Sequence, residues 1–199
     1  MKISRSIWRR CRPRIEAACR RVDRDPATVR LLPVSKTKPE SRLRMAHMAG
    51  CRVLGENKVQ EAYRKWESMQ DLADLQWSVI GHLQTNKAKL VARFATEFQA
   101  LDSLRLAEAL DRRLQVEGRS LDVFVQVNTS GEASKYGLSP DDVPAFIQAL
   151  PTFSALRVRG AHDAGAVLQR GRTRAPVFCT VASVARAIAA KSPDRHRSG

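Results

Sequence analysis

The chain has 199 residues, four cysteines and a formal net charge of +15 at pH 7. This length suits one domain with a sizeable core, and the scattered cysteines indicate neither a disulfide framework nor a zinc site. Since no apolar stretch approaches membrane-spanning length, we expect a soluble, cytoplasmic protein without a membrane partner.

The basic excess lies at the two ends of the chain. Residues 1–30 carry a net charge of +7 and residues 161–199 carry +5, whereas the body, 31–160, carries only +3. No helix-turn-helix, zinc-finger or RNP-type motif accompanies these charges, so no specific nucleic-acid partner is expected. Nonspecific, salt-sensitive binding of the basic ends to a duplex is the alternative that this charge leaves open.

Helical and strand periodicities alternate along the body. The apolar residues of 9–22 share one helical face, and the apolar run 30–35 then predicts a strand. The same two patterns predict further strands at 51–55, 76–80, 98–101, 123–127 and from 156, separated by helices at 42–49, 58–69, 86–94, 104–117 and from 139.

Such alternation means parallel βαβ units, and the fold class is therefore α/β. Six units in series fit either a doubly wound sheet or an incomplete (β/α)₈ barrel. No G-x-G-x-x-G motif follows the first predicted strand, which weighs against the dinucleotide-binding version of the doubly wound sheet. After Gly160 the alternation stops, and only one further helix, 181–191, is suggested.

Lys36 is the first candidate for chemistry, because the apolar run before it ends on its amine and Pro39 then stops the segment. Partial burial at the mouth of a strand lowers the pKa of a lysine ammonium, and the neutral amine can attack an aldehyde. A solvated lysine at a strand end is common, so the run alone does not establish this chemistry.

Polar residues also follow three other predicted strands, at 55–57, 81–84 and 128–130. Function in parallel α/β domains gathers at this edge of the sheet. Taken singly, Asn57 fits a helix cap, His82 fits a hydrogen-bonded loop histidine and Lys135 fits an ordinary loop lysine. Taken together, the segments form a more specific pattern than any one of them alone.

Four runs, in order and with matching spacing, resemble the pyridoxal 5′-phosphate homeostasis proteins, which are stand-alone relatives of the alanine racemase N-terminal barrel. The runs are LLPVSKTKP (31–39), LGENKVQEA (54–62), WSVIGHLQTNK (77–87) and VFVQVNTSGEASKYGL (123–138). The similarity extends from about Ile7 to Gly160. It implies a TIM-barrel-like (β/α)₈ fold of the alanine racemase N-terminal type, of which about six units are present here.

The resemblance also implies a site and a role. Lys36 would form an internal aldimine with pyridoxal 5′-phosphate, Asn57 would lie close to the cofactor, and His82 would lie near the barrel mouth. Lys135 would be a secondary contact at most. The implied role is intracellular homeostasis of the cofactor without turnover, with pyridoxal phosphate-dependent apoenzymes as further partners, in a monomer or weak dimer.

Two alternative functions remain open beside this interpretation. One is a racemase-like pyridoxal phosphate enzyme acting on amino acids, which needs a second acid/base on the other face of the imine. Alanine racemases supply a tyrosine from a separate C-terminal domain, and no such residue was identified in this sequence. The other alternative is a truncated remnant without function.

The chain departs from the family at Pro33 and Ser78, and most of all after residue 160. A Ser-Met-Gly-Met-Ser segment and an Arg-Val/Ile-Gly segment, which form the phosphate cup, are missing. We therefore expect a barrel part, 1–160, with weakened cofactor binding and a divergent tail, 161–199, that is poorly ordered or helical. Codons for 161–165 read one nucleotide later admit Leu-Met-Thr-Leu-Ala, the family's continuation, which suggests a shifted reading frame.

Overall fold

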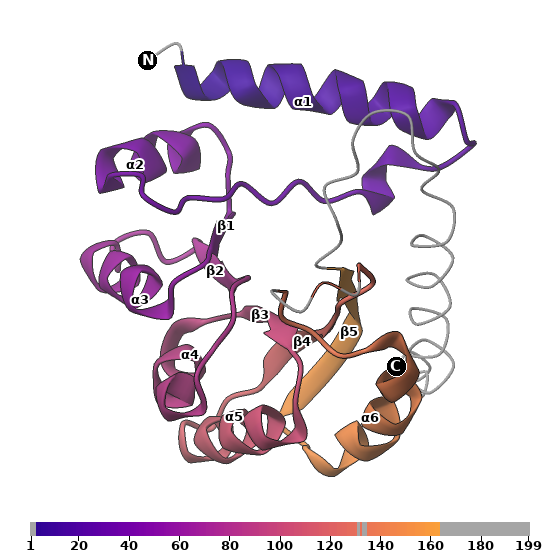
Figure 1. Ribbon diagram of the computed structural model, residues 1–199. Coiled ribbons are helices and arrows are strands. Elements are labelled where there is room, and N and C mark those ends of the chain that lie inside the picture. The colour runs from indigo at the N-terminus through magenta and orange to yellow at the C-terminus, as the bar shows by residue number, and fades with distance from the viewer. Residues whose placement is uncertain (1–2, 131, 133–134, 164–199) are drawn as a thin grey trace, which may run out of the picture.

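A parallel sheet forms the centre of the computed structural model, which describes residues 3–130, 132 and 135–163. Its strands are β1 (Val53–Glu56), β2 (Gln76–Val79), β3 (Glu97–Leu101), β4 (Leu121–Val127) and β5 (Leu156–Asp163). They lie in the order β1-β2-β3-β4-β5 and every neighbouring pair is parallel (Figure 1). Because the order follows the chain without reversal, the winding is that of a barrel, since a doubly wound sheet reverses its order.

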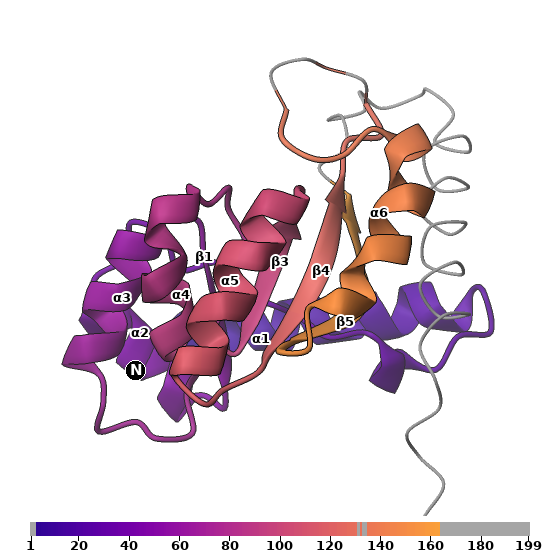
Figure 2. The same ribbon diagram turned by 90° about the horizontal axis from the view of Figure 1, so that it is seen from below.

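Helices connect the strands. They are α1 (Ile3–Arg20), α2 (Glu40–Met48), α3 (Val59–Ser68), α4 (Ala88–Phe94), α5 (Leu104–Val116) and α6 (Val143–Ala149), with short 3₁₀ turns η1 (Pro26–Thr28), η2 (Thr85–Lys87), η3 (Pro140–Asp142) and η4 (Leu150–Thr152). The helices α2 to α6 follow one another along the outside of the curved sheet, and α1 lies beyond α2 (Figures 1 and 2). The described part thus has the layers of an open barrel.

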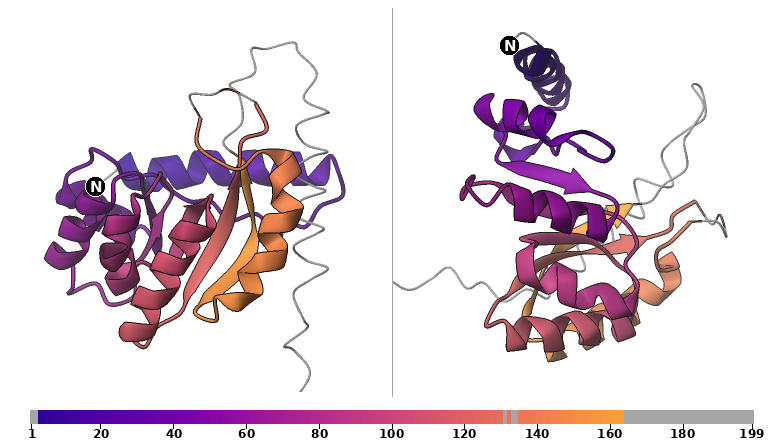
Figure 3. Two further views of the ribbon diagram at one scale, coloured as in Figure 1. Left: turned by 60° about the horizontal axis from the view of Figure 1, so that its bottom comes forward. Right: turned by 90° about the vertical axis from the view of Figure 1, so that its left-hand side faces the viewer.

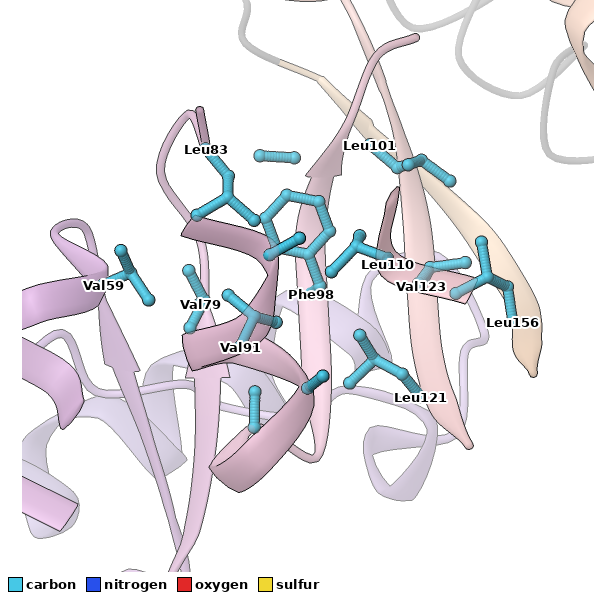
Figure 4. Packing of buried hydrophobic residues seen from close by; sticks show 14 of the residues in the cluster. Val59, Val79, Leu83, Val91, Phe98, Leu101, Leu110, Leu121, Val123 and Leu156 are labelled. Carbon is cyan, nitrogen blue, oxygen red and sulfur yellow. The ribbon is translucent and has the colours of Figure 1, made fainter. Parts of the chain in front are cut away.

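The core lies between the strands and these outer helices. Val91 of α4 and Leu110 of α5 pack over the sheet, where Phe98 and Val123 are fully buried (Figure 4). Fully burying each such side chain contributes about 1.5–3 kcal/mol, so this layer stabilises the packing of the helices against the sheet. Among the described residues, no helix combines the length and apolar character needed to cross a bilayer.

Helix ends that carry a local capping signal lie close to their predicted places, whereas the first helix, expected over 9–22, spans Ile3–Arg20. The hydroxyl oxygen of Ser103 accepts a hydrogen bond from the backbone N–H of Leu106 at 3.3 Å and so caps α5. Gly118 follows the same helix with a φ of +62°, which favours glycine. Ser139 caps η3, with Pro140 as its first residue, whereas the helix expected from 139 begins as α6 only at Val143.

The first predicted strand, 30–35, is wrong as a regular strand. Only Val34 forms an isolated bridge, to Gly55, supported by backbone bonds from Gly55 to Pro33 and from Ser35 to Gly55 at 2.8 and 2.9 Å. Pro33 has no N–H to donate, and within the described ranges β1 is the one strand with which this segment forms a bridge. The segment still occupies the first place in the sheet order.

The last described strand, β5, continues three residues past the predicted boundary at Gly160. Ala161, His162 and Asp163 pair with Val125, Gln126 and Val127 of β4. The remainder of the predicted tail, including the helix suggested at 181–191, lies outside the described residues.

Candidate functional site

The carboxyl ends of parallel strands meet at one edge of the sheet, and the predicted site residues follow those ends. Lys36 comes shortly after the bridging residue Val34, and Asn57 directly follows β1. His82 lies in the loop after β2. The chain that follows β4 projects from the same edge (Figure 3). The structure therefore gathers these residues at the edge where barrel proteins hold their ligands.

Lys36 lies in a tight turn and is exposed, so the partial burial expected from the sequence is wrong. The turn is closed by a hydrogen bond from the backbone N–H of Lys38 to the carbonyl of Ser35 at 3.0 Å. Thr37 has a φ of +60°, a left-handed conformation that costs an L-residue roughly 1–2 kcal/mol. Neighbouring groups must therefore hold this turn in place.

Those groups form a largely buried polar network on the helix side of the turn. Fully buried Glu56 accepts from the hydroxyl of Ser35 at 2.6 Å and from the ammonium of Lys65 at 2.5 Å. Lys65 also donates to the carbonyl of Ser35 and to Glu61. The hydrogen bond from Lys65, followed by that from the backbone of Thr37, lowers the pKa of the Glu61 carboxyl.

The sequence does not predict this hydrogen-bond network. The spacing of Glu61 and Lys65 is the ordinary i, i+4 ion pair of an exposed helix face. The approach of both residues to the Lys36 turn becomes visible only when α3 is packed against β1.

Asn57 is exposed and does not cap the following helix, because the N-cap position of α3 is Lys58 and makes no side-chain cap bond. The loop after β2 presses against its backbone. A Cβ atom added to Gly81 would lie 2.2 Å from the carbonyl oxygen of Asn57. Glycine at position 81 therefore lets the chain after β2 contact the chain after β1.

His82 joins three loops of the same edge. Its Nδ1 lies 3.7 Å from a carboxylate oxygen of Asp102, which follows β3. Its ring stacks on Tyr136, with centroids 3.9 Å apart and 10° between the planes. Burial raises the pKa of Asp102, and the neighbouring His82 opposes that shift. Tyr136 is 57% exposed and was not among the residues predicted from the sequence.

Lys135 precedes Tyr136 and is exposed. Its backbone N–H donates to Glu132 at 3.0 Å, and the next glycine, Gly137, has a φ of +122°. A Cβ at Gly137 would lie 2.8 Å from the backbone nitrogen of Asn128, so glycine permits the return of the chain to β4.

The predicted residues thus share one edge without bonding to one another. Within the described ranges, no hydrogen bond or ion pair joins Lys36, Asn57 and His82 directly. No group of three or more metal-ligating side chains is found among the residues that the structure describes. An amine can add to a carbonyl group, and an imidazole and a phenol can exchange protons, so these are the reactive groups that this edge presents.

The sequence of this chain is similar to a known family model and to several known proteins. Residues 12–195 match the model of the alanine racemase N-terminal domain. The pyridoxal phosphate homeostasis protein of Pseudomonas aeruginosa is 44% identical over 147 residues, which are 74% of this chain and 64% of that protein. The pyridoxal phosphate homeostasis protein of Aquifex aeolicus is 33% identical over 165 residues, which are 83% of this chain and 72% of that protein.

The chain is also similar to solved structures. PipY of Synechococcus elongatus, solved without pyridoxal phosphate, is 33% identical with a TM-score of 0.78, covering 90% of this chain and 83% of that one. PipY with pyridoxal phosphate bound gives a TM-score of 0.76 at 30% identity with the same coverage. An alanine racemase of Clostridium difficile, 12% identical with a TM-score of 0.59 over 82% of this chain and 42% of that one, shares the fold alone.

Proposed function

This chain belongs to the alanine racemase N-terminal domain family, among its pyridoxal phosphate homeostasis proteins, and from that premise we propose that it binds pyridoxal 5′-phosphate and serves its intracellular homeostasis. The matched part spans 64% of the Pseudomonas aeruginosa relative. The proposed role is cytoplasmic, with pyridoxal phosphate-dependent apoenzymes as the recipients of the cofactor.

The observation that carries the proposal is the position of Lys36. Its amine is accessible at the carboxyl edge of the sheet, in a fold that matches the pyridoxal phosphate-bound structure of PipY. In our proposal the ε-amino group of Lys36 holds the aldehyde carbon of the cofactor, and Asn57 and His82 border it. The cofactor supplies an aldehyde that bonds to amines and an electron sink for amino-acid chemistry.

The residues present fit the aldehyde end of such a ligand. An amine has to be reachable for covalent attachment, and the exposure of Lys36 provides this. The ring of His82 lies against Asp102 and Tyr136, and this pair of planar rings supports the proposal that a flat aromatic ligand lies at this edge.

The direct test is spectroscopic and chemical. We expect the purified chain incubated with pyridoxal 5′-phosphate to develop a visible absorbance that borohydride abolishes, leaving a phosphopyridoxyl label on a lysine. Peptide mapping should find the label on Lys36 rather than on Lys38, two residues further along the same turn. A label chiefly on another lysine would contradict the assignment.

A racemase-like enzyme is the second candidate, and one observation favours it. Tyr136 and His82 place a phenol and an imidazole at the same edge, where either group suits acid/base chemistry. Exchange of the α-proton of alanine with deuterated water, measured by NMR with the loaded protein, separates the two functions. A carrier leaves the α-proton in place, whereas a racemase exchanges it and interconverts the enantiomers.

A further inference from the structure

Lys65 uses all three hydrogens of its ammonium group on three separate acceptors. It donates to the carbonyl of Ser35 at 2.8 Å, to Oε1 of Glu56 at 2.5 Å and to Oε1 of Glu61 at 2.7 Å. Its side chain is 12% exposed and Glu56 is fully buried. A lysine has three donors and no acceptor, so the bonding capacity of Lys65 is filled at this place.

Two of these acceptors control the backbone around Lys36. The carbonyl of Ser35 belongs to the peptide group that precedes the Cα of Lys36. Glu61 in turn accepts the backbone N–H of Thr37 at 2.8 Å, and that N–H belongs to the peptide group that follows the same Cα. The peptide planes on both sides of Lys36 are therefore held from α3.

We infer that Lys65 and Glu61 are positioning residues, which fix the backbone of Lys36 and so direct its amine toward an aldehyde ligand. This inference rests on the proposed function of Lys36. A side chain attached to a fixed backbone reaches one region of space, whereas the left-handed conformation of Thr37 would relax if its N–H were released. Holding the amine in one orientation accelerates its addition to a bound carbonyl and excludes neighbouring amines.

A purely structural network would behave differently. The same bonds also compensate the buried carboxylate of Glu56, so their loss changes stability in either case. In variants that remain folded, a positioning role makes the choice of lysine depend on these bonds. The informative quantity is therefore the ratio of label on Lys36 to label on Lys38 after borohydride reduction.

The experiment uses the full chain with pyridoxal 5′-phosphate. The variants are Glu61→Ala, which removes the acceptor for Thr37, and the double variant Lys65→Met with Glu56→Gln, which removes the ammonium without leaving a buried charge. Glu61→Gln keeps an acceptor oxygen and is the conservative rescue. Lys58→Met and Glu67→Gln, at the N-cap and on the exposed face of α3, are the matched controls.

We expect Glu61→Ala and the double variant each to lower the Lys36-to-Lys38 ratio by about tenfold, a change that the loss of one backbone anchor can produce. Glu61→Gln should recover most of the ratio, and both controls should match the parent chain. An unchanged ratio in folded Glu61→Ala and double-variant protein overturns the inference.

A second measurement separates this inference from the proposed function. Reductive methylation with formaldehyde modifies lysine amines without the cofactor, and its rate at Lys36 relative to Lys38 should change in the same two variants. If the parent chain forms no reducible adduct with pyridoxal 5′-phosphate, the proposed function fails. The positioning role then stands if the methylation ratio shifts in the variants and falls if it does not.

Discussion

Gly81 shows how a single residue shapes the candidate site. Its missing side chain lets the loop that carries His82 rest on the backbone of Asn57, because a Cβ would lie 2.2 Å from a carbonyl oxygen. We expect Gly81→Ala to lower the free energy of unfolding by about 1–3 kcal/mol, as overpacking typically does. Urea denaturation followed by circular dichroism measures this loss.

The matched control for that substitution is Gly160→Ala. A Cβ there would meet the ring of Phe124 at an ordinary 3.5 Å, so its effect should be much smaller. Equal destabilisation by the two variants would show that the close approach at Gly81 does not determine the loop.

Asp102 gives a prediction about pH. Burial raises the pKa of its carboxyl above the ordinary 3.8, so the folded protein binds that proton more tightly than the unfolded chain. The stabilisation from this proton is complete below pH 3.8 and is lost as the pH rises through the raised pKa. The free energy of unfolding of the parent chain, relative to Asp102→Asn, should therefore fall with rising pH above 3.8 and then level off. A relative stability that rises over this window would contradict the assignment.

At the scale of elements, α3 is fixed to the first part of the sheet by the buried pair of Lys65 and Glu56. Removing one partner of a buried pair leaves an uncompensated charge, which costs about 3–5 kcal/mol. We expect this loss for Lys65→Met in thermal or denaturant unfolding. Adding Glu56→Gln should recover more than half of it, because no charge is then buried.

Lys58→Met is the control for this element, since Lys58 is exposed at the N-cap of α3. Its effect should stay within about 0.5 kcal/mol, the usual range for surface positions. If Lys65→Met behaved like this control, the pair would not be what joins α3 to β1.

At the scale of the whole molecule, residues 161–199 do not contain the Ser-Met-Gly-Met-Ser and Arg-Val/Ile-Gly segments that the family resemblance implies for phosphate binding, which leads to a prediction about cofactor affinity. Each charge-assisted hydrogen bond to a phosphate contributes about 1.5–3 kcal/mol, so losing two weakens binding by roughly two to four orders of magnitude. We expect the cofactor to leave this chain during extensive dialysis, as measured by its absorbance. The Pseudomonas aeruginosa relative, dialysed in parallel, is the comparison. Full retention by this chain would show that other groups hold the phosphate.

The reading-frame hypothesis also belongs to this scale. The nucleotide sequence of the locus should encode, in the frame one nucleotide later than that of residues 161–199, the Ser-Met-Gly-Met-Ser and Arg-x-Gly segments. If that frame lacks them, the divergent tail is native and the hypothesis is wrong.

Several features of this protein were determined by its sequence alone, because the signals are local. The alternation of apolar periods predicted the strands β1 to β5 and the helices between them to within a few residues. The sequence offers Asp102 or Ser103 as the N-cap of α5 and Gly118 as its closing residue; the structure uses Ser103, and Gly118 has the positive φ expected after a helix end. Four spaced motifs predicted the family, since each depends only on residues adjacent in the chain.

Tertiary structure alone decided what surrounds the candidate site. The sequence could not show that Lys36 is exposed, because burial depends on which elements pack over a turn. Nor could it pair His82 with Tyr136, or bring Lys65 and Glu61 to the peptide groups around Lys36, since these contacts join segments far apart in the chain. The same holds for the first predicted strand: Pro33 weakens it locally, but only the structure shows that it forms a single bridge, from Val34 to Gly55 of β1. Local patterns specify elements, whereas the contacts that orient an amine arise only when those elements meet.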